Sequence, residues 1–199
     1  MGTGVHPGRS QPAGALLFPG AGSSRAHHTL TALAEALAPL PVGRADFPYR
    51  KAGRRAPDRP PVLLATVRQE AADLAAELGV GSECLLLGGR SMGGRIASMA
   101  VAEGLVAWGL VLISYPLHPP GRPERLRTEH FPAIRVPTLF VSGTRDTFGT
   151  VEELESATRA ISGPVTHVWI ENGRHELDRV DPRIVAAVQQ WLAGQTGAG

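Results

Sequence analysis

The stretch Gly89-Arg90-Ser91-Met92-Gly93 decides the fold, because it joins two segments of different character. Residues 84–88 before it form a short apolar run with the length of a buried strand, and residues 95–103 after it are good helix formers. A serine on a sharp strand-to-helix turn projects its hydroxyl above the sheet. Its neighbours must be small, because a β-carbon there would clash with the adjacent strand or helix. The pattern predicts that Ser91 is a nucleophile at a helix N-terminus, where backbone N–H groups favour a developing negative charge.

Two later loops carry the partners that a nucleophilic serine needs, which are a base and a carboxylate that orients the base. Asp146 follows the strand-like run 138–142, and His175 follows the strand-like run 165–170. Taken separately, Asp146 could cap the next helix and His175 could be an ordinary loop histidine. Their order after the serine and their positions past strand ends instead favour a triad of Ser91, Asp146 and His175.

An oxyanion hole would complete such a site with two backbone N–H donors. The N–H of Met92 is the first candidate, because it follows the serine directly. The second is expected from the loop 19–24, after the strand-like run 13–18, and we favour Ala21 or Gly22. In the same region, Ser23 and Arg90 are candidates to face a substrate.

The glycines of this loop also allow an alternative, which is a dinucleotide-binding turn. Gly20-Ala21-Gly22 would need a third glycine, and the chain offers Arg25 instead. Only Asp46 stands where a ribose-binding acid would be expected. We therefore expect no bound cofactor. No metal site is predicted either, because His27-His28 and His175-Glu176 lack a third ligand at helical spacing.

These segments resemble the α/β-hydrolase-like family that includes testis-expressed protein 30 and the third subunit of the NSL acetyltransferase complex. The residues that carry the resemblance are the run 88–95 with its extra Gly94-Arg95, the run 114–121 (Ser-Tyr-Pro-Leu-His-Pro-Pro-Gly) and the acid-bearing run 137–146. The chain is more distantly similar to dienelactone hydrolases, which carry cysteine where this chain carries Ser91. The resemblance implies the fold strongly and the substrate hardly at all, because members are mostly uncharacterised and some serve in protein complexes.

Apolar runs and helical patterns alternate along the whole chain, which is typical of a parallel sheet covered on both faces. We therefore predict the α/β class and a trimmed α/β-hydrolase fold of about six mostly parallel strands, with helices on both faces and no lid domain. Helices are expected at 27–38, 62–78, 150–161 and from 181 onward, a further strand at 42–47, and a loop at 49–61. The longest irregular connection, 115–136, is expected to overlie the site with side chains that could face substrate: Tyr115, His118, Arg122, Arg125, Arg127 and His130. For the residues from His118 to His130, the alternative is a solvated polar loop.

The composition fits one globular domain, with 43% hydrophobic residues in 199. We expect a disordered arm at 1–12, a single domain at 13–194 and a flexible tail at 195–199. The N-terminus lacks a signal-peptide pattern, no apolar run is long enough for a bilayer, and the single cysteine allows no internal disulfide, so we expect a cytoplasmic protein. A formal net charge of +2 is too small to indicate nucleic-acid binding.

Together these features predict a serine hydrolase that acts on a small ester, thioester or related acyl compound. The alternative is a hydrolase-like binding or scaffold module whose triad is not used. The expected partner is a small-molecule acyl substrate, with no membrane partner. The sequence leaves open whether the chain also binds a second copy of itself or another protein.

Overall fold

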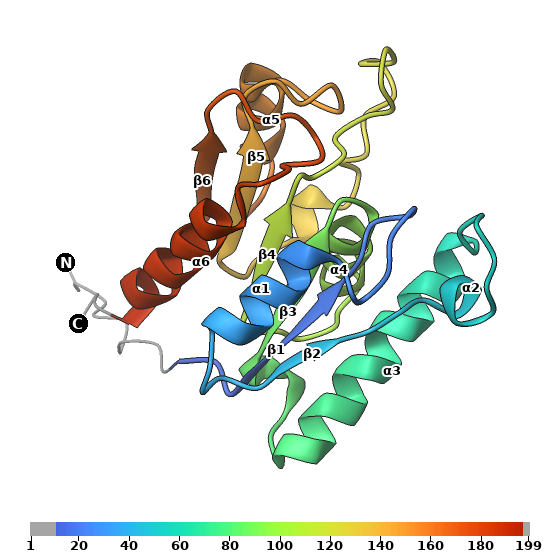
Figure 1. The fold of residues 1–199 in the computed structure, drawn as a ribbon, viewed down its shortest axis with the longest axis vertical. Helices are drawn as coiled ribbons and strands as arrows, with labels where there is room; N and C mark the ends of the chain where they lie inside the picture. The colour runs from blue at the N-terminus through green and yellow to red at the C-terminus, as the bar shows by residue number, and fades with distance from the viewer. Residues whose placement is uncertain (1–10, 197–199) are drawn as a thin grey trace.

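The computed structural model of the chain describes residues 11–196. Residues 1–10 and 197–199, which hold most of the expected arm and tail, lie outside this part. One six-stranded sheet runs through the described residues (Figure 1). Its strands are β1 (Gly14–Phe18), β2 (Val42–Arg44), β3 (Leu85–Arg90), β4 (Gly109–Ile113), β5 (Thr138–Gly143) and β6 (Val165–Ile170).

All neighbouring strands pair in parallel, in the order β2-β1-β3-β4-β5-β6. The predicted α/β-hydrolase type of sheet is therefore confirmed. The chain moves outward from β1 to β2 and then returns to build the rest of the sheet on the other side of β1. The order thus reverses between β1 and β3, and in open parallel sheets ligands bind at the carboxyl ends of the strands at such a point. The loop after β1 and the serine turn after β3 meet at this point.

Helices cover both faces of the sheet, as predicted (Figure 1). Side chains along a strand alternate between the two faces, so Leu85 and Leu87 pack into one hydrophobic cluster while Leu86 packs into the other. One face carries α1 (His28–Ala36) and α6 (Asp181–Thr196), and the other carries α3 (Pro60–Leu78), α4 (Met92–Ala102) and α5 (Val151–Thr158). The strand ends that bear the candidate residues are therefore held between two packed layers.

The structure corrects the expected elements between β1 and β3. The strand expected at 42–47 ends at Arg44, and the loop expected at 49–61 begins with a short helix, α2 (Pro48–Lys51). Pro48 occupies the first turn of α2, where its fixed φ favours a helix start and its missing N–H is not needed. Tyr49 is fully buried there and anchors a segment that we had expected to be a loop.

No lid domain interrupts the sheet within residues 11–196. The long connection after β4 contains only a 3-10 turn, Phe131–Ala133, and Phe131 belongs to the hydrophobic core. Among the same residues, no helix has the length and apolar character required to cross a membrane.

Candidate active site

The turn between β3 and α4 places Ser91 in a strained backbone conformation. Its φ is 51° and its ψ is −119°, which is rare for a residue with a β-carbon. The Ser91 N–H donates to the carbonyl of Ile113 at 2.8 Å, which ties the turn to β4. A β-carbon at Gly89 or Gly93 would overlap the carbonyl oxygen of Phe18. The glycines are thus required by the close approach of β1, and α4 begins directly at Met92, three residues earlier than expected.

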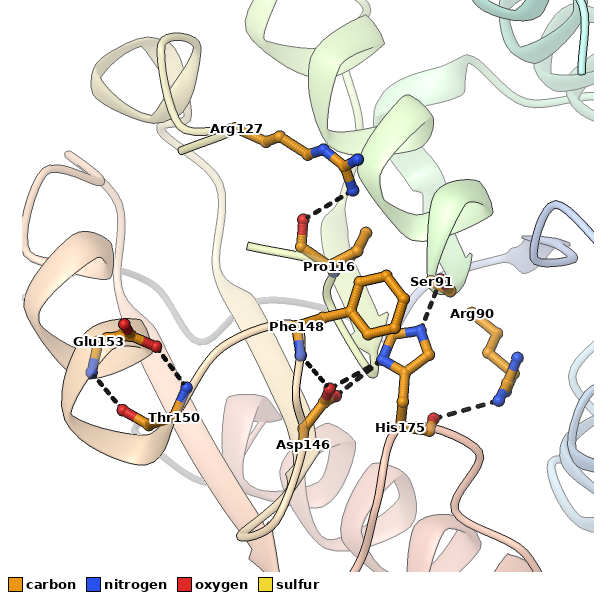
Figure 2. A network of polar contacts seen from close by, with 9 residues as sticks. All are labelled: Arg90, Ser91, Pro116, Arg127, Asp146, Phe148, Thr150, Glu153 and His175. Atoms are coloured by element: carbon orange, nitrogen blue, oxygen red, sulfur yellow. Dashed lines mark hydrogen bonds and ion pairs between the residues drawn. The ribbon is translucent and has the colours of Figure 1, made fainter. Parts of the chain in front are cut away.

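Three side chains predicted from separate parts of the chain meet at this turn (Figure 2). The Ser91 Oγ lies 2.9 Å from the Nε2 of His175. The Nδ1 of the same ring lies 3.0 Å and 2.8 Å from the two carboxylate oxygens of Asp146. His175 is 8% exposed and Asp146 is 5% exposed, so water has little access to the pair. This is the geometry in which a histidine accepts a serine proton while a carboxylate fixes its tautomer.

Two further residues hold the histidine, and sequence reasoning gave neither of them this role. The Phe148 ring stacks on the His175 ring with centroids 4.0 Å apart, and the Phe148 N–H donates to Asp146 at 2.8 Å. On the other side, the Arg90 guanidinium donates to the backbone carbonyl of His175 at 3.1 Å (Figure 2). An aromatic residue two positions after an acid has no motif of its own, so only the fold could reveal the stacking.

The candidate oxyanion donors lie beside the serine. Within residues 11–196, the N–H groups of Ala21, Gly22 and Met92 donate to no protein acceptor. Met92 is the first residue of α4, and its N–H is one of those that a helix leaves unpaired. In the loop after β1, the Ser23 N–H donates a hydrogen bond to the Gly20 carbonyl at 3.1 Å, which forms a turn. These donors are free to bind a developing oxyanion.

Tyr49 supports this loop from the core, a role that the sequence did not indicate. Its hydroxyl donates to the carbonyl of Ala21 at 2.7 Å, and its side chain is fully buried. Burial raises the pKa of the Tyr49 phenol, so the hydroxyl remains a donor. The short helix α2 thus fixes the peptide that carries the Gly22 N–H.

We expect Tyr49→Phe to lower kcat while leaving KM nearly unchanged, because a loosened oxyanion loop weakens transition-state binding in particular. Loss of the bond is worth about 0.5–1.5 kcal/mol of stability, which predicts a fall in Tm of a few degrees, and a fall in kcat of roughly threefold to tenfold. Steady-state kinetics and thermal unfolding measure both effects. The matched control is Thr158→Val, which removes a buried hydroxyl remote from Ser91 that bonds to Glu155 and His167. If both variants lost the same stability with kcat unchanged, Tyr49 would have only a structural role.

A cavity of about 690 Å³ opens over the serine. Ser23 and Arg90, which we proposed as candidates to face a substrate, both line it. Its polar wall also includes residues that we had not proposed to face a substrate: His27, Arg95, Glu176 and Asp178. Burial, together with the charge of Arg90, lowers the pKa of His27 to about 4, so this ring is neutral at pH 7.

Tyr115 and His118 do not line this cavity, which corrects the expectation that they face substrate. Tyr115 is 2% exposed and packs against Phe131 and Phe140 in the core. His118 is also buried, with its ring nitrogens 2.8 Å from the Pro119 carbonyl and 3.2 Å from a carboxylate. The segment after β4 continues into the core before it reaches the surface, so its first residues serve packing.

The rest of this connection is divided between cavity and surface. Arg127 lines the cavity, whereas Arg122 and Arg125 are exposed outside it. His130 also lies outside the cavity and bonds to Ser98 of α4 at 2.8 Å. Within residues 11–196 no group of three or more histidine, cysteine, aspartate or glutamate side chains could hold a metal ion.

The fold and this geometry place the chain in a known family. Residues 12–190 match the family described as alpha/beta hydrolase domain, and the chain belongs to it. Among solved structures, Est1E from Butyrivibrio proteoclasticus is similar, with a TM-score of 0.73 and 16% identity over 94% of this chain and 89% of that one. An alpha-beta serine hydrolase homologue from Coxiella burnetii gives 0.69 and 18%, over 94% and 87%. Dienelactone hydrolase from Anabaena variabilis gives 0.67 and 19%, over 92% and 87%. At these identities the likeness establishes the fold.

Proposed function

We propose that the chain is a serine hydrolase that cleaves a small ester, thioester or related acyl compound. The observation that carries the proposal is the continuous hydrogen-bonded chain from Ser91 through His175 to Asp146, beneath an open cavity. A scaffold protein has no need for a strained serine conformation, free oxyanion donors and a stacked imidazole at one point.

The reaction follows from the roles that each group can take. His175 removes the proton from the Ser91 hydroxyl as its oxygen attacks the carbonyl carbon, and Asp146 stabilises the imidazolium that forms. The N–H groups of Met92 and of Ala21 or Gly22 receive the oxyanion. The imidazolium then protonates the leaving group, and water, activated by the same histidine, releases the acid from Ser91.

Ester substrates are the first class to test. Est1E, which shares the fold, has been solved with ferulic acid bound. The same proposal includes three further points. The chain is a member of the testis-expressed protein 30 and NSL subunit family, it is located in the cytoplasm, and its physiological partner is a small acyl compound. The alternative, a binding module without turnover, would use the same cavity to hold a ligand that it does not cleave.

Labelling with a fluorophosphonate probe, combined with hydrolysis of a panel of neutral esters, distinguishes a serine hydrolase from a binding module. We expect covalent labelling and measurable turnover by the wild-type protein, because both require an activated serine. Folded protein that reacted with neither the probe nor the panel would contradict the proposal and favour the binding module.

We further expect a preference for short acyl groups of about two to four carbons. Each buried CH₂ is worth about 0.8 kcal/mol where an apolar pocket exists, but here three arginines, two carboxylates and two glycines are among the residues that line the cavity. From the connection 115–136, only Pro116 and Arg127 reach it. The measurement is kcat/KM for p-nitrophenyl esters of increasing chain length. A value that climbed steadily to eight carbons or beyond would mean that a deep apolar pocket exists.

A further inference from the structure

Two arginines stand together on one side of the cavity that opens over Ser91. Arg95 lies in the first turn of α4, four residues after Ser91, and both residues line the cavity. Arg127 enters from the connection after β4, and its guanidinium lies over Pro116 (Figure 2). Its backbone is fixed at both ends, because the Tyr115 hydroxyl donates to its carbonyl at 2.6 Å and its N–H donates to the Leu117 carbonyl at 2.8 Å.

Neither guanidinium is neutralised by the protein. Within residues 11–196 the Arg95 side chain makes no hydrogen bond or ion pair, although its Nε is buried. The Arg127 guanidinium makes one long contact, 3.5 Å to the carbonyl of Pro116. By contrast, Arg54 and Arg68 on the surface each contact a carboxylate, at 2.6 Å and 3.2 Å. Both arginines are partly buried, and a charge that is partly removed from water without a counter-charge is unfavourable. Two cations without a carboxylate partner beside the nucleophile therefore indicate a place for an anion.

The two carboxylates that line the cavity lie toward its third arginine, Arg90. Glu176 and Asp178 act on Arg90, where they oppose the lowering of its pKa by burial. Burial also lowers the pKa of Arg127, and there the nearby charge of Arg95 lowers it further. The cavity therefore has a mixed-charge side at Arg90 and a side at Arg95 and Arg127 that faces it with two cations. Away from the cavity, the same two arginines line a surface hollow with Glu124 and Glu129, and neither carboxylate forms an ion pair with them within residues 11–196.

We propose that Arg95 and Arg127 bind a carboxylate of the substrate, so that the enzyme acts on anionic esters. This inference rests on the hydrolase function proposed above and names its substrate class. Arginine presents a planar fork of donors that matches a carboxylate. The Arg95 N–H donates to the Ser91 carbonyl at 3.1 Å, so the two residues are one hydrogen-bonded turn of chain apart. The carboxylate is therefore separated from the scissile carbonyl by a short spacer, on either the acyl or the leaving-group side.

Matched pairs of esters that differ only in charge test this subsite. For the acyl side, kcat/KM of monoethyl succinate is compared with that of ethyl succinamate. For the leaving-group side, 4-acetoxybenzoate is compared with 4-acetoxybenzamide. We expect the wild-type protein to favour the carboxylate over the carboxamide at least tenfold in one pair, and that pair identifies the side. The preference should weaken as sodium chloride is raised, because salt screens charge pairs.

Variants then assign the preference to the two arginines. Arg95→Gln and Arg127→Gln should each lower the carboxylate-to-carboxamide ratio roughly tenfold, the size expected for a charge-assisted hydrogen bond. The matched control is Arg122→Gln, an exposed arginine on the same connection that does not line the cavity, and it should keep the wild-type ratio. Circular dichroism and Tm establish that each variant is folded. If neither cavity variant folds, the wild-type ratio and its salt dependence still decide.

The two proposals fail in different ways. Turnover of both carboxamides at rates equal to or above those of the carboxylates would overturn the anion subsite and leave the hydrolase function standing. A ratio that both arginine variants retain would do the same. A folded protein that cleaved none of the four compounds and bound no fluorophosphonate would overturn the hydrolase function, and the subsite inference with it.

Discussion

Ser91→Ala is expected to abolish both fluorophosphonate labelling and ester turnover. Within residues 11–196, Ser91 is the residue whose hydroxyl contacts the Nε2 of His175, and removal of a serine-hydrolase nucleophile lowers kcat roughly 10⁶-fold. The fold should tolerate the change, because alanine keeps the β-carbon and the turn is held by backbone bonds from the Ser91 N–H to Ile113 and from the Arg95 N–H to the Ser91 carbonyl. Active-site titration, the ester assay and thermal unfolding measure the three quantities.

The matched control is Ser162→Ala, because Ser162 is an exposed serine whose hydroxyl donates to the carbonyl of Pro132 outside the cavity. This variant should label and turn over like the wild-type protein. Labelling that persisted in Ser91→Ala would show that the probe reacts elsewhere, and turnover that persisted would show that Ser91 is not the nucleophile.

Asp146→Asn is expected to lower kcat by about 10⁴-fold, as in the serine-protease template. An amide at this position can donate to the Nδ1 of His175, which places the ring proton on Nε2. The ring then cannot accept the Ser91 proton. Steady-state kinetics measure the loss, and Tm establishes that the variant is folded.

Other acids near His175 in the sequence are tested in the same way. Glu171→Gln is the matched control, because Glu171 is exposed at the end of β6 and does not line the cavity. It should retain wild-type kinetics. Asp181 is engaged with α1, since its carboxylate accepts from the Thr29 hydroxyl at 2.7 Å and lies 2.6 Å from His28. If the kcat of Asp146→Asn stayed within a factor of ten of the wild-type value, another carboxylate would have to orient His175.

Local pattern was sufficient to predict the sheet and the positions of the candidate catalytic residues. The central strands β1, β3, β4 and β5 are short, mostly apolar runs. Each main helix repeats its apolar face every three or four residues, and the glycines around Ser91 mark a strand-to-helix turn. In a parallel sheet, every strand end followed by a loop lies on the same edge, so Asp146 and His175 could be placed near Ser91 without coordinates. The physical reason is that strand direction and periodicity are properties of neighbouring residues.

Only the tertiary structure decided which side chains support and surround that site. Tyr49 bonds to Ala21 across 28 positions, Phe148 stacks on His175, and Tyr115 turns into the core instead of facing substrate. Such contacts join residues that no short-range pattern relates, and they depend on how α2 and the connection after β4 pack. The sequence by itself thus determined an α/β-hydrolase with a serine at its elbow. The packing of distant segments decided that two arginines face the cavity above this serine from one side, because Arg95 and Arg127 become neighbours only when α4 and the long connection meet.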